Sequence, residues 1–316
     1  RLDAIRIGLL DADLEGRLQS MAPREATRDE LARVHTAAHI RAVADTAGRT
    51  VRFDADTAAG PRSYAAALLA AGAACDAVDQ VLDGALDRAF CAVRPPGHHA
   101  EAGRAMGFCL FNNVAVAAAH ALARGLERVL IVDFDVHHGN GTQDIFFADR
   151  RVLYVSSHAW PFYPGTGALQ EVGEGDARGF TVNLPMPMGC GDGEYQRLYR
   201  EIVVPIGLAF DPQLVLVSAG FDAFGGDPLA GMRLTADGYG ELAAACLQTA
   251  MGSAAGRVVF VLEGGYDTEG LATGAAAVVR RMLGEDRPSL AAACAPSFAA
   301  LVASQRRFLA TWWPIG

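Results

Sequence analysis

Short apolar runs alternate with longer alanine- and leucine-rich stretches along most of the chain. The short runs are rich in β-branched residues, which predicts strands at Ala89–Val93, Arg128–Asp133, Val152–Ser156, Phe180–Leu184, Leu214–Ser218 and Arg257–Leu262. The longer stretches predict helices at Ser63–Leu82, Asn113–Arg124, Glu194–Phe210, Thr235–Met251 and Thr268–Leu283. Because the strands are uniformly apolar and alternate with helices, we expect an α/β fold with an open, mostly parallel sheet covered by helices on both faces. No repeat or linker-like stretch divides the chain, so one domain is expected over residues 1–316.

Two of the predicted helices begin with a residue that suits a helix N-cap. Thr235 and Thr268 each carry a hydroxyl that can accept a backbone N–H of the first turn. Asp237 and Glu269 then place negative charge in that turn, where it favours the helix dipole. These signals set the predicted starts of both helices.

Polar, glycine-rich segments follow the predicted strands at regular places. They are RPPGHHA (Arg94–Ala100), DFDVHHGNG (Asp133–Gly141), SSHAWPFYPGTG (Ser156–Gly167), SAGFDAFGGDP (Ser218–Pro228) and EGGYD (Glu263–Asp267). In open α/β sheets, ligands bind outside the carboxyl ends of the strands. We therefore expect an active site where these five segments meet.

Composition and charge narrow the range of partners. Of the 316 residues, 51% are hydrophobic and 20% are charged, which suits a globular protein with a large core. The apolar strand runs are far shorter than a bilayer-spanning helix and no secretory signal pattern precedes them, so no membrane association is expected. The formal net charge of −9 argues against nucleic acid as the main partner. An acidic surface is compatible with cationic substrates, although its commoner role is solubility.

The basic residues and the cysteines carry further information. All 27 basic residues are arginine, which excludes a P-loop lysine and a Schiff-base lysine. Together with the heavy use of alanine, this is typical of a GC-rich, bacterial genome. The six cysteines form no C-x-x-C pair, which favours buried thiols in a reducing compartment and a cytoplasmic location.

A metal site is indicated by three side chains that follow two strands. Asp135 and His137 are two residues apart, so in extended backbone both face the same side and can reach one ion. Asp222 follows the strand LVLVS and would arrive from another part of the same edge. One histidine and two carboxylates leave a coordination position open, as in catalytic zinc sites, and a set without sulfur would also accept iron(II). Taken alone, the D-x-H spacing also fits a structural aspartate with a capping histidine.

The tandem pair His98 and His99 follows the segment RPPG. Metal-assisted hydrolysis needs a group that accepts a proton from water and returns it to the leaving amine, and histidine titrates near neutrality. Asp133 and Asn140 flank the predicted ligands and can orient the two rings. Because an aspartate partner raises ring basicity more than an asparagine does, we expect two different roles. The alternative is two loop histidines with satisfied hydrogen bonds.

Tyr266 lies in the glycine-hinged segment EGGYD, just after a predicted strand. A phenol placed there could donate a hydrogen bond to a polarised carbonyl and stabilise the developing oxyanion. Tyrosine after paired glycines is also a common core residue, so this motif by itself does not decide between the two.

Six segments together resemble the histone deacetylase superfamily, especially its class II members and their bacterial relatives: RPPGHHA, GFCLFNNVAVAA, VLIVDFDVHHGNGTQDIFF, YPGTG, LVLVSAGFDAFGGDPLAG and VLEGGYD. The resemblance covers nearly the whole chain. It implies a parallel sheet of about eight strands related to the arginase fold. The segment from Arg1 resembles the stretch just after the family's first strand, so that strand is expected to be missing here. The implied zinc ligands are Asp135, His137 and Asp222.

The resemblance also implies a division of labour around the metal. His99, paired with Asn140, would be the general base and then the general acid. His98, paired with Asp133, would contribute electrostatic stabilisation, and Tyr266 would polarise the scissile carbonyl. Class I relatives usually carry aspartate at the position of Asn140, so this residue favours class II.

A structural potassium site and an acyl-lysine tunnel are implied as well. The potassium ligands would come from Asp133, Asp135, His137, Ser156 and Ser157, several of them through backbone carbonyls. The tunnel and its rim would be formed by Gly107, Phe108, Tyr163, Leu229, Gly264 and Asp54. Asp56 competes with Asp54 for the role of the acidic rim residue.

Several functions remain open at this stage. The main expectation is removal of acetyl or other acyl groups from acyl-lysine in peptides or proteins. An acylpolyamine amidohydrolase is the nearest alternative; Leu229 after Asp227-Pro228 and the short spacer between HHA and GFC favour acyl-lysine. A dinuclear ureohydrolase lacks the further carboxylates that it needs, and a non-catalytic acyl-lysine binder would have lost a functional residue. Acyl length and oligomeric state stay undetermined; the apolar tail Phe308–Trp313 could pack on its own domain or on a neighbouring subunit.

Overall fold

The computed structural model describes residues 1–285 and 293–316. Its centre is a parallel sheet in the order β3-β8-β7-β4-β5-β6. The strands are β3 (Arg88–Cys91), β4 (Val129–Asp133), β5 (Val152–Ala159), β6 (Thr181–Met186), β7 (Leu214–Ala219) and β8 (Val258–Leu262). The predicted α/β class and all six predicted strands are confirmed. Within the described residues, the sheet has six strands rather than the eight or so that the resemblance implies.

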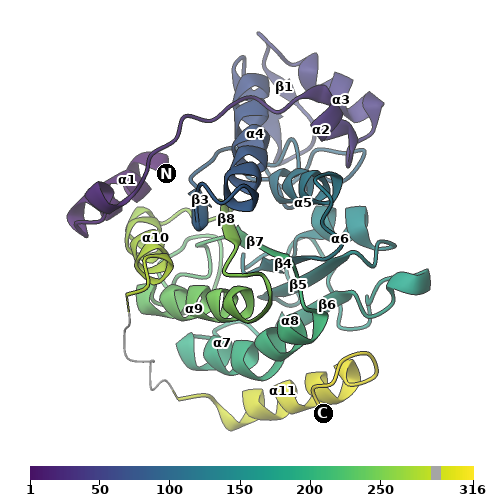
Figure 1. The fold of residues 1–316 in the computed structure, drawn as a ribbon, viewed down its shortest axis with the longest axis vertical. Coiled ribbons are helices and arrows are strands. Elements are labelled where there is room, and N and C mark those ends of the chain that lie inside the picture. The colour runs from purple at the N-terminus through teal and green to yellow at the C-terminus, as the bar shows by residue number, and fades with distance from the viewer. Residues whose placement is uncertain (286–292) are drawn as a thin grey trace.

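Helices cover both faces of this sheet (Figure 1). On one face lie α4 (Ser63–Leu82) and α5 (Asn113–Ala123), and on the other lie α7 (Asp192–Leu198), α8 (Val204–Phe210) and α9 (Ala236–Ser253). Alternate residues of β4 enter the two resulting cores: Leu130 and Val132 pack on one side, Val129 and Ile131 on the other. A strand buried on both faces favours apolar side chains on both, which is why β4 is an apolar run up to Asp133 at its carboxyl end.

The predicted helices are all present, with two changes of detail. The stretch predicted as one helix at Glu194–Phe210 is α7 and α8 joined by the π-helical turn Tyr199–Val203. The hydroxyl of Thr235 caps α9 by accepting the N–H of Gly238, as predicted. The cap of α10 (Thr268–Met282) is Asp267 rather than Thr268, because the Asp267 carboxylate accepts the N–H of Gly270 at 2.6 Å.

Several elements carry too little pattern to be predicted. They are α1 (Leu2–Asp11), α2 (Arg28–Ala32), α3 (Ala37–Ala44), the antiparallel pair β1 (Val51–Arg52) and β2 (Ala58–Ala59), α6 (Asn140–Phe146) and α11 (Pro296–Leu309). α1 lies along α10 at the side of the molecule (Figure 1). α11 packs against α7 and lies at the bottom of the view in Figure 1. The apolar tail therefore packs on its own domain: Trp313 is buried against Phe180 and Phe210, and its indole N–H donates to Gly179 O.

Among the described residues, α4 is the one helix long and apolar enough to cross a membrane by length and composition. Half of its most apolar stretch is buried in the domain, where α4 packs against α5 and β3. Its alanines favour the helix and allow this close packing. In this fold, α4 is a core helix.

A buried histidine ties the N-terminal helices to the site loops and predicts acid sensitivity. His35 Nε2 accepts the N–H of Asn112, so its Nδ1–H must donate to Glu101 O, which lies 3.0 Å away. Burial lowers the pKa of His35 to about 3, from about 6.5 in an unfolded chain. Between these values the unfolded state binds the extra proton, so lowering the pH from 6.5 toward 3 destabilises the fold by about 1.4 kcal/mol per pH unit from this group.

We therefore expect the melting temperature to fall as the pH is lowered below 6.5. His35→Gln should be less stable at pH 7.5. Its free energy of unfolding should fall less steeply as the pH is lowered, by the contribution of about one proton. Thermal unfolding from pH 7.5 to 5 in both proteins measures this. Equal slopes for the two proteins would contradict the assignment.

Candidate active site

The strand order brings four polar loops to one edge of the sheet. β3, β8, β7 and β4 are neighbours and parallel, so the segments that follow them leave at the same edge. Asp133 at the end of β4 lies opposite Ser218 of β7, and Ser218 lies opposite Val261 of β8. The predicted meeting of these loops at the carboxyl ends of the strands is therefore present.

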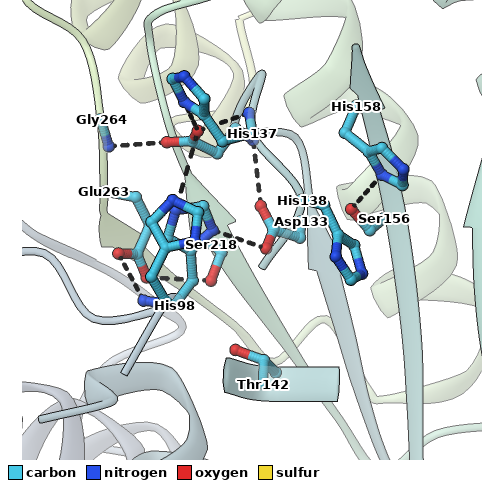
Figure 2. A network of polar contacts seen from close by, with 12 residues as sticks. His98, Asp133, His137, His138, Thr142, Ser156, His158, Ser218, Glu263 and Gly264 are labelled. Atoms are coloured by element: carbon cyan, nitrogen blue, oxygen red, sulfur yellow. Dashed lines mark hydrogen bonds and ion pairs between the residues drawn. The ribbon is translucent and has the colours of Figure 1, made fainter. Parts of the chain in front are cut away.

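The three predicted metal ligands lie together. One ligand atom from each of Asp135, His137 and Asp222 falls within 4.8 Å of the others. His137 Nδ1 is 3.1 Å from Asp135 Oδ1 and 3.1 Å from Asp222 Oδ2. The two carboxylates also hold neighbouring backbone: Asp222 Oδ1 accepts the N–H of Val136, and Asp135 Oδ2 accepts the N–H of Gly264. Figure 2 shows the Gly264 contact.

The donor set fits a divalent cation. Asp135 and Asp222 have no exposed surface, and burial together with the negative charge of Asp135 raises the pKa of Asp222. Two buried carboxylates this close need a positive charge between them. The backbone approaches so closely that a Cβ on Gly264 would lie 2.2 Å from Asp222 Oδ2, and one on Gly220 would lie 2.0 Å from Asp135 Oδ2. Asp135, Asp222 and His137 could therefore hold a metal ion through two oxygen ligands and one nitrogen ligand.

The tandem histidines lie beside this cluster with the predicted partners. His98 Nδ1 donates to Asp133 Oδ2 at 3.0 Å, and His99 Nδ1 lies 2.9 Å from Asn140 Oδ1. Both rings are almost completely buried, and their centroids are 4.0 Å apart. Asp133 is held in turn by the hydroxyl of Tyr154, a partner that the sequence did not indicate.

The two rings differ in charge because their partners differ. Burial opposes charge on His98, but Asp133 and Asp135 outweigh it and raise the pKa of His98 to about 10. Burial lowers the pKa of His99 well below its usual value, and the positive charges of His98 and His137 add to this. Asp133 and Asp135 therefore favour the charged form of His98, whereas the surroundings of His99 favour its neutral form, which can accept a proton.

Gly139 makes the His98–Asp133 pair sensitive to a single methyl group. A Cβ at this position would lie 2.4 Å from Asp133 Oδ2 and 3.0 Å from His98 Nδ1. We expect Gly139→Ala to displace the pair and to lower kcat about 10- to 100-fold, the usual cost of losing a partner of a functional histidine. Steady-state kinetics and a melting curve measure the effect, with Gly103→Ala as control because no atom approaches its Cβ within 4 Å. Unchanged kcat in a folded Gly139→Ala protein would contradict this.

Glu263 is a functional-site residue that sequence reasoning missed. It is fully buried under the tandem histidines, where Oε2 accepts the N–H groups of Gly97 and His98 at 2.6 and 3.1 Å (Figure 2). Its other oxygen accepts the hydroxyl of Ser218 at 3.1 Å. Burial raises the pKa of Glu263 to about 7. This side chain joins the loops after β3, β7 and β8 beneath the site.

Tyr266 is positioned by two residues outside its own loop. Asp227 Oδ2 accepts the N–H of Tyr266 at 2.6 Å, and Asp227 Oδ1 accepts the N–H of Leu229 at 2.9 Å. The guanidinium of Arg1 donates to Gly265 O and lies 5.0 Å from the centre of the Tyr266 ring. Burial and the carboxylates of Asp222 and Asp135 raise the pKa of the Tyr266 phenol, so it stays a hydrogen-bond donor.

A pocket of about 180 Å³ connects these groups with the surface. Its lining contains the cluster Asp135, His137 and Asp222, both tandem histidines and Tyr266, together with Asp56, Pro96, Gly107, Phe108, Tyr163, Leu229 and Gly264. Of the predicted tunnel and rim residues, all but Asp54 are in this set. Phe108 and Tyr163 are 44% and 37% exposed as residues, so they form walls of the opening rather than core.

Asp56 lines the opening, whereas Asp54 does not line the pocket, although burial and then the charge of Asp54 raise the pKa of Tyr163 in its wall. Asp54 Oδ1 accepts the N–H groups of Asp56 and Thr57 and so closes its own turn. Asp56 is exposed and lines the pocket. Sequence alone could not separate two aspartates in one short loop, because their roles depend on which one folds back onto the backbone.

A buried polar network behind the pocket holds the loop that carries Tyr163. His138 Nδ1 lies 2.8 Å from the hydroxyl of Thr166, and His138 Nε2 lies 3.0 Å from Gln143 Oε1. His158 donates to Gly167 O at 2.9 Å, and its Nδ1 is 2.9 Å from Ser156 Oγ (Figure 2). These contacts tie the YPGTG segment to β5 and α6. They were not predicted, since His138 and His158 follow no pattern that marks a site.

The predicted potassium ligands lie on neighbouring segments. Asp133 at the end of β4 is paired with Ser156 of β5 in the sheet register. The Ser156 and Ser157 hydroxyls contact His158 and Tyr199, respectively, so these side chains already have partners. Any cation there would depend on backbone carbonyls for much of its coordination.

A second group of potential ligands, Glu30, Cys75 and His120, is also close enough to surround an ion. Here, however, the Glu30 carboxylate is bound by both terminal nitrogens of Arg24 at 2.9 and 2.7 Å. Arg33 donates to His120 Nδ1 at 2.8 Å, and burial raises the pKa of Cys75, which keeps the thiol protonated. The guanidinium groups already supply the positive charge, so this cluster is a buried ion-pair network.

The histone deacetylase domain model matches residues 1–282 of the sequence. The chain belongs to the histone deacetylase family. The crystal structure of the HDA15 HD domain matches it with a TM-score of 0.93 at 41% identity, over 99% of this chain and 87% of that one.

Curated members of the histone deacetylase family are similar over most of the chain. Histone deacetylase 15 of Arabidopsis thaliana is 44% identical over 95% of this chain and 55% of its own length. A probable deacetylase of Archaeoglobus fulgidus is 41% identical over 80% and 71%, respectively. Human polyamine deacetylase HDAC10 is 41% identical over 99% of this chain and 49% of its own length. The chain thus spans about half the length of two of these relatives.

Proposed function

We propose that this chain is a zinc-dependent amidohydrolase that removes acetyl or other acyl groups from the side-chain amine of acyl-lysine in peptides or proteins. One observation carries the proposal: a single pocket joins the Asp135–His137–Asp222 cluster, the neutral His99 and the phenol of Tyr266 to an aromatic opening. Hydrolytic deacylation needs these parts within reach of one amide.

Asp135, His137 and Asp222 would hold the metal ion, and iron(II) would suit the same donors. When bound, such an ion supplies Lewis-acid chemistry: it makes water more acidic and polarises a carbonyl. We also propose a structural potassium ion near Asp133 and Ser156, on the basis of the family resemblance.

The protein groups account for the proton movements. In amide hydrolysis, a bond forms between the water oxygen and the acyl carbon, the C–N bond breaks, and the amine leaves with a proton. His99 accepts the proton of the water and returns it to the amine, since its pKa is low enough for the neutral ring to be present. Tyr266 donates a hydrogen bond to the carbonyl oxygen as negative charge develops there. His98, charged and paired with Asp133, stabilises that charge electrostatically.

The rim favours acyl-lysine, with acylated polyamine as the second candidate. Leu229, which is 42% exposed, places an apolar side chain at the opening. A second ammonium group of a polyamine would find no ion-pair partner in this side chain. Glu101 does not line the pocket, because Arg104 binds its carboxylate. The exposed Asp56 and the similarity to human polyamine deacetylase HDAC10 support the alternative.

Hydrolysis rates of an acetyl-lysine peptide and an acetylated polyamine on zinc-loaded protein test the proposal. We expect faster cleavage of the peptide. Leu229→Glu should shift the ratio of kcat/KM toward the polyamine by about two- to fivefold, which corresponds to about 0.4–1 kcal/mol from one new exposed ion pair. Leu229→Gln is the matched control, because it has the same size as the glutamate without its charge. Faster polyamine cleavage by the unmodified protein would make polyamine the substrate, and hydrolysis of neither amide would refute the proposed function.

A further inference from the structure

The tautomer of His99 depends on which way the Asn140 amide points. His99 Nδ1 lies 2.9 Å from Asn140 Oδ1. An amide oxygen only accepts hydrogen bonds, so His99 Nδ1 must carry the hydrogen and Nε2 must carry the lone pair. A flipped amide would present its NH₂ group to Nδ1 and would favour the opposite tautomer, in which Nε2 carries the hydrogen and cannot accept a proton.

One carboxylate determines the direction of this amide. Asn140 Nδ2 donates to Glu101 Oε1 at 2.9 Å and also approaches Met106 Sδ at 3.3 Å. A carboxylate oxygen in an ion pair only accepts, so it pairs with the NH₂ half of the amide and repels the oxygen half. With Glu101 in place, the amide oxygen is therefore left facing His99.

Glu101 is itself held from several sides. Arg104 donates to both carboxylate oxygens, at 2.7 and 3.1 Å, and the Glu101 N–H donates to Arg104 O at 3.0 Å. His35 Nδ1–H donates to the Glu101 backbone carbonyl. The side chain is only 25% exposed. These contacts restrict the rotamers of Glu101, so its carboxylate stays in hydrogen-bond distance of the Asn140 amide.

We propose that Glu101 is a positioning residue for the hydrolytic reaction: it orients the Asn140 amide and thereby selects the His99 tautomer that presents Nε2 to the pocket. The kinetic part of this inference rests on the proposed function; the tautomer part does not. Glu101 belongs neither to the pocket lining nor to the metal cluster, and its hydrogen bond to Asn140 is the contact through which it reaches His99.

Three variants test this relay by exchanging donors and acceptors. In Glu101→Gln, residue 101 can present either its oxygen or its NH₂ group, so it no longer fixes the orientation of the Asn140 amide. The kcat should fall about tenfold, with KM unchanged within about twofold. Asn140→Asp sets two carboxylates against each other and should lower kcat by at least as much. In the double variant, the new amide at position 101 can donate its NH₂ group to the new carboxylate at position 140, whose other oxygen is left to accept from His99 Nδ1. The kcat of this double variant should recover to within about threefold of the unchanged protein.

The kinetic controls separate this effect from a general loss of structure. Glu127→Gln, a change of the same kind at an exposed surface position, should leave kcat unchanged. Melting temperatures identify any variant that does not fold. A double variant no more active than Asn140→Asp alone, or a kcat of Glu101→Gln within twofold of the unchanged protein, would overturn the proposal.

Long-range ¹H–¹⁵N NMR of the histidine rings reads the tautomer directly, without metal or substrate. The unchanged protein should show His99 protonated at Nδ1 only, and Glu101→Gln should show signal for both neutral forms. The same single tautomer in both proteins would overturn the proposal. If the unchanged protein hydrolyses no amide, the proposed function fails, while this measurement still decides the role of Glu101.

Discussion

Replacing Tyr266 with phenylalanine is expected to lower kcat by about 10²- to 10³-fold and to leave KM within about threefold, the usual effect of removing one oxyanion donor. The variant removes a single hydroxyl. The ring would keep its neighbours. Its centre lies 6.0 Å from the centre of the Phe108 ring and 5.0 Å from the guanidinium carbon of Arg1. Asp227 holds the loop through backbone N–H groups, which the substitution does not change.

Steady-state kinetics on the acetyl-lysine peptide measure the effect, and a zinc-dependent rise in melting temperature shows that the metal cluster is intact. Tyr239→Phe is the matched control, because the buried Tyr239 hydroxyl makes no hydrogen bond within the described part of the chain. A Tyr266→Phe enzyme with kcat within about fivefold of the unchanged protein would exclude carbonyl polarisation by this phenol.

The second large effect is expected for Asp222→Asn, which should abolish measurable turnover, a loss of about 10³-fold or more, because it removes one of two anionic ligands. The shape of the side chain is kept, so the amide oxygen can still accept the N–H of Val136. Without metal, the variant should be more stable than the unchanged protein, because a buried carboxylate no longer repels Asp135.

Thermal unfolding with and without zinc separates these contributions. A ligand present at 100 times its dissociation constant stabilises the native state by about 2.7 kcal/mol, so the unchanged protein should melt at a clearly higher temperature with zinc. At the same zinc concentration, Asp222→Asn should show no rise. Asp56→Asn, at the exposed rim of the same pocket, should keep the full rise. Equal zinc stabilisation of Asp222→Asn and the unchanged protein would place the metal elsewhere.

The amino-acid pattern by itself was enough for the layered α/β architecture. Strands such as Val129–Asp133 and Leu214–Ala219 are buried on both faces, and a strand in that position is mainly apolar, so each begins as a continuous run of four apolar residues. The glycine-rich loops could be assigned to one edge for the same reason: parallel strands end on the same side. Short elements such as Leu2–Asp11 and Arg28–Ala32 escaped prediction because their periodicity is too brief to separate from loop.

The site residues that project from those loops were also recognisable, because their types and spacing within one segment carry the chemistry. Asp135, His137, His98 and His99 could be assigned together on this basis, and the structure places them in one pocket with Asp222 and Tyr266. The residues that support them could not be found in this way. Glu263 contacts Gly97 across 166 positions of the chain, and Asp227 contacts Tyr266 across 39.

Only the tertiary structure decided which of several similar residues performs each supporting role. It placed Asp56 in the pocket lining and turned one carboxylate oxygen of Asp54 onto its own loop, and it made Asp267 rather than Thr268 the cap of α10. It also brought the Glu101 carboxylate into hydrogen-bond contact with Asn140. The physical reason is the same in each case: burial and strand pairing are encoded in local runs of the sequence, whereas a hydrogen bond depends on distances of a few ångströms between segments that the chain brings together only when it folds.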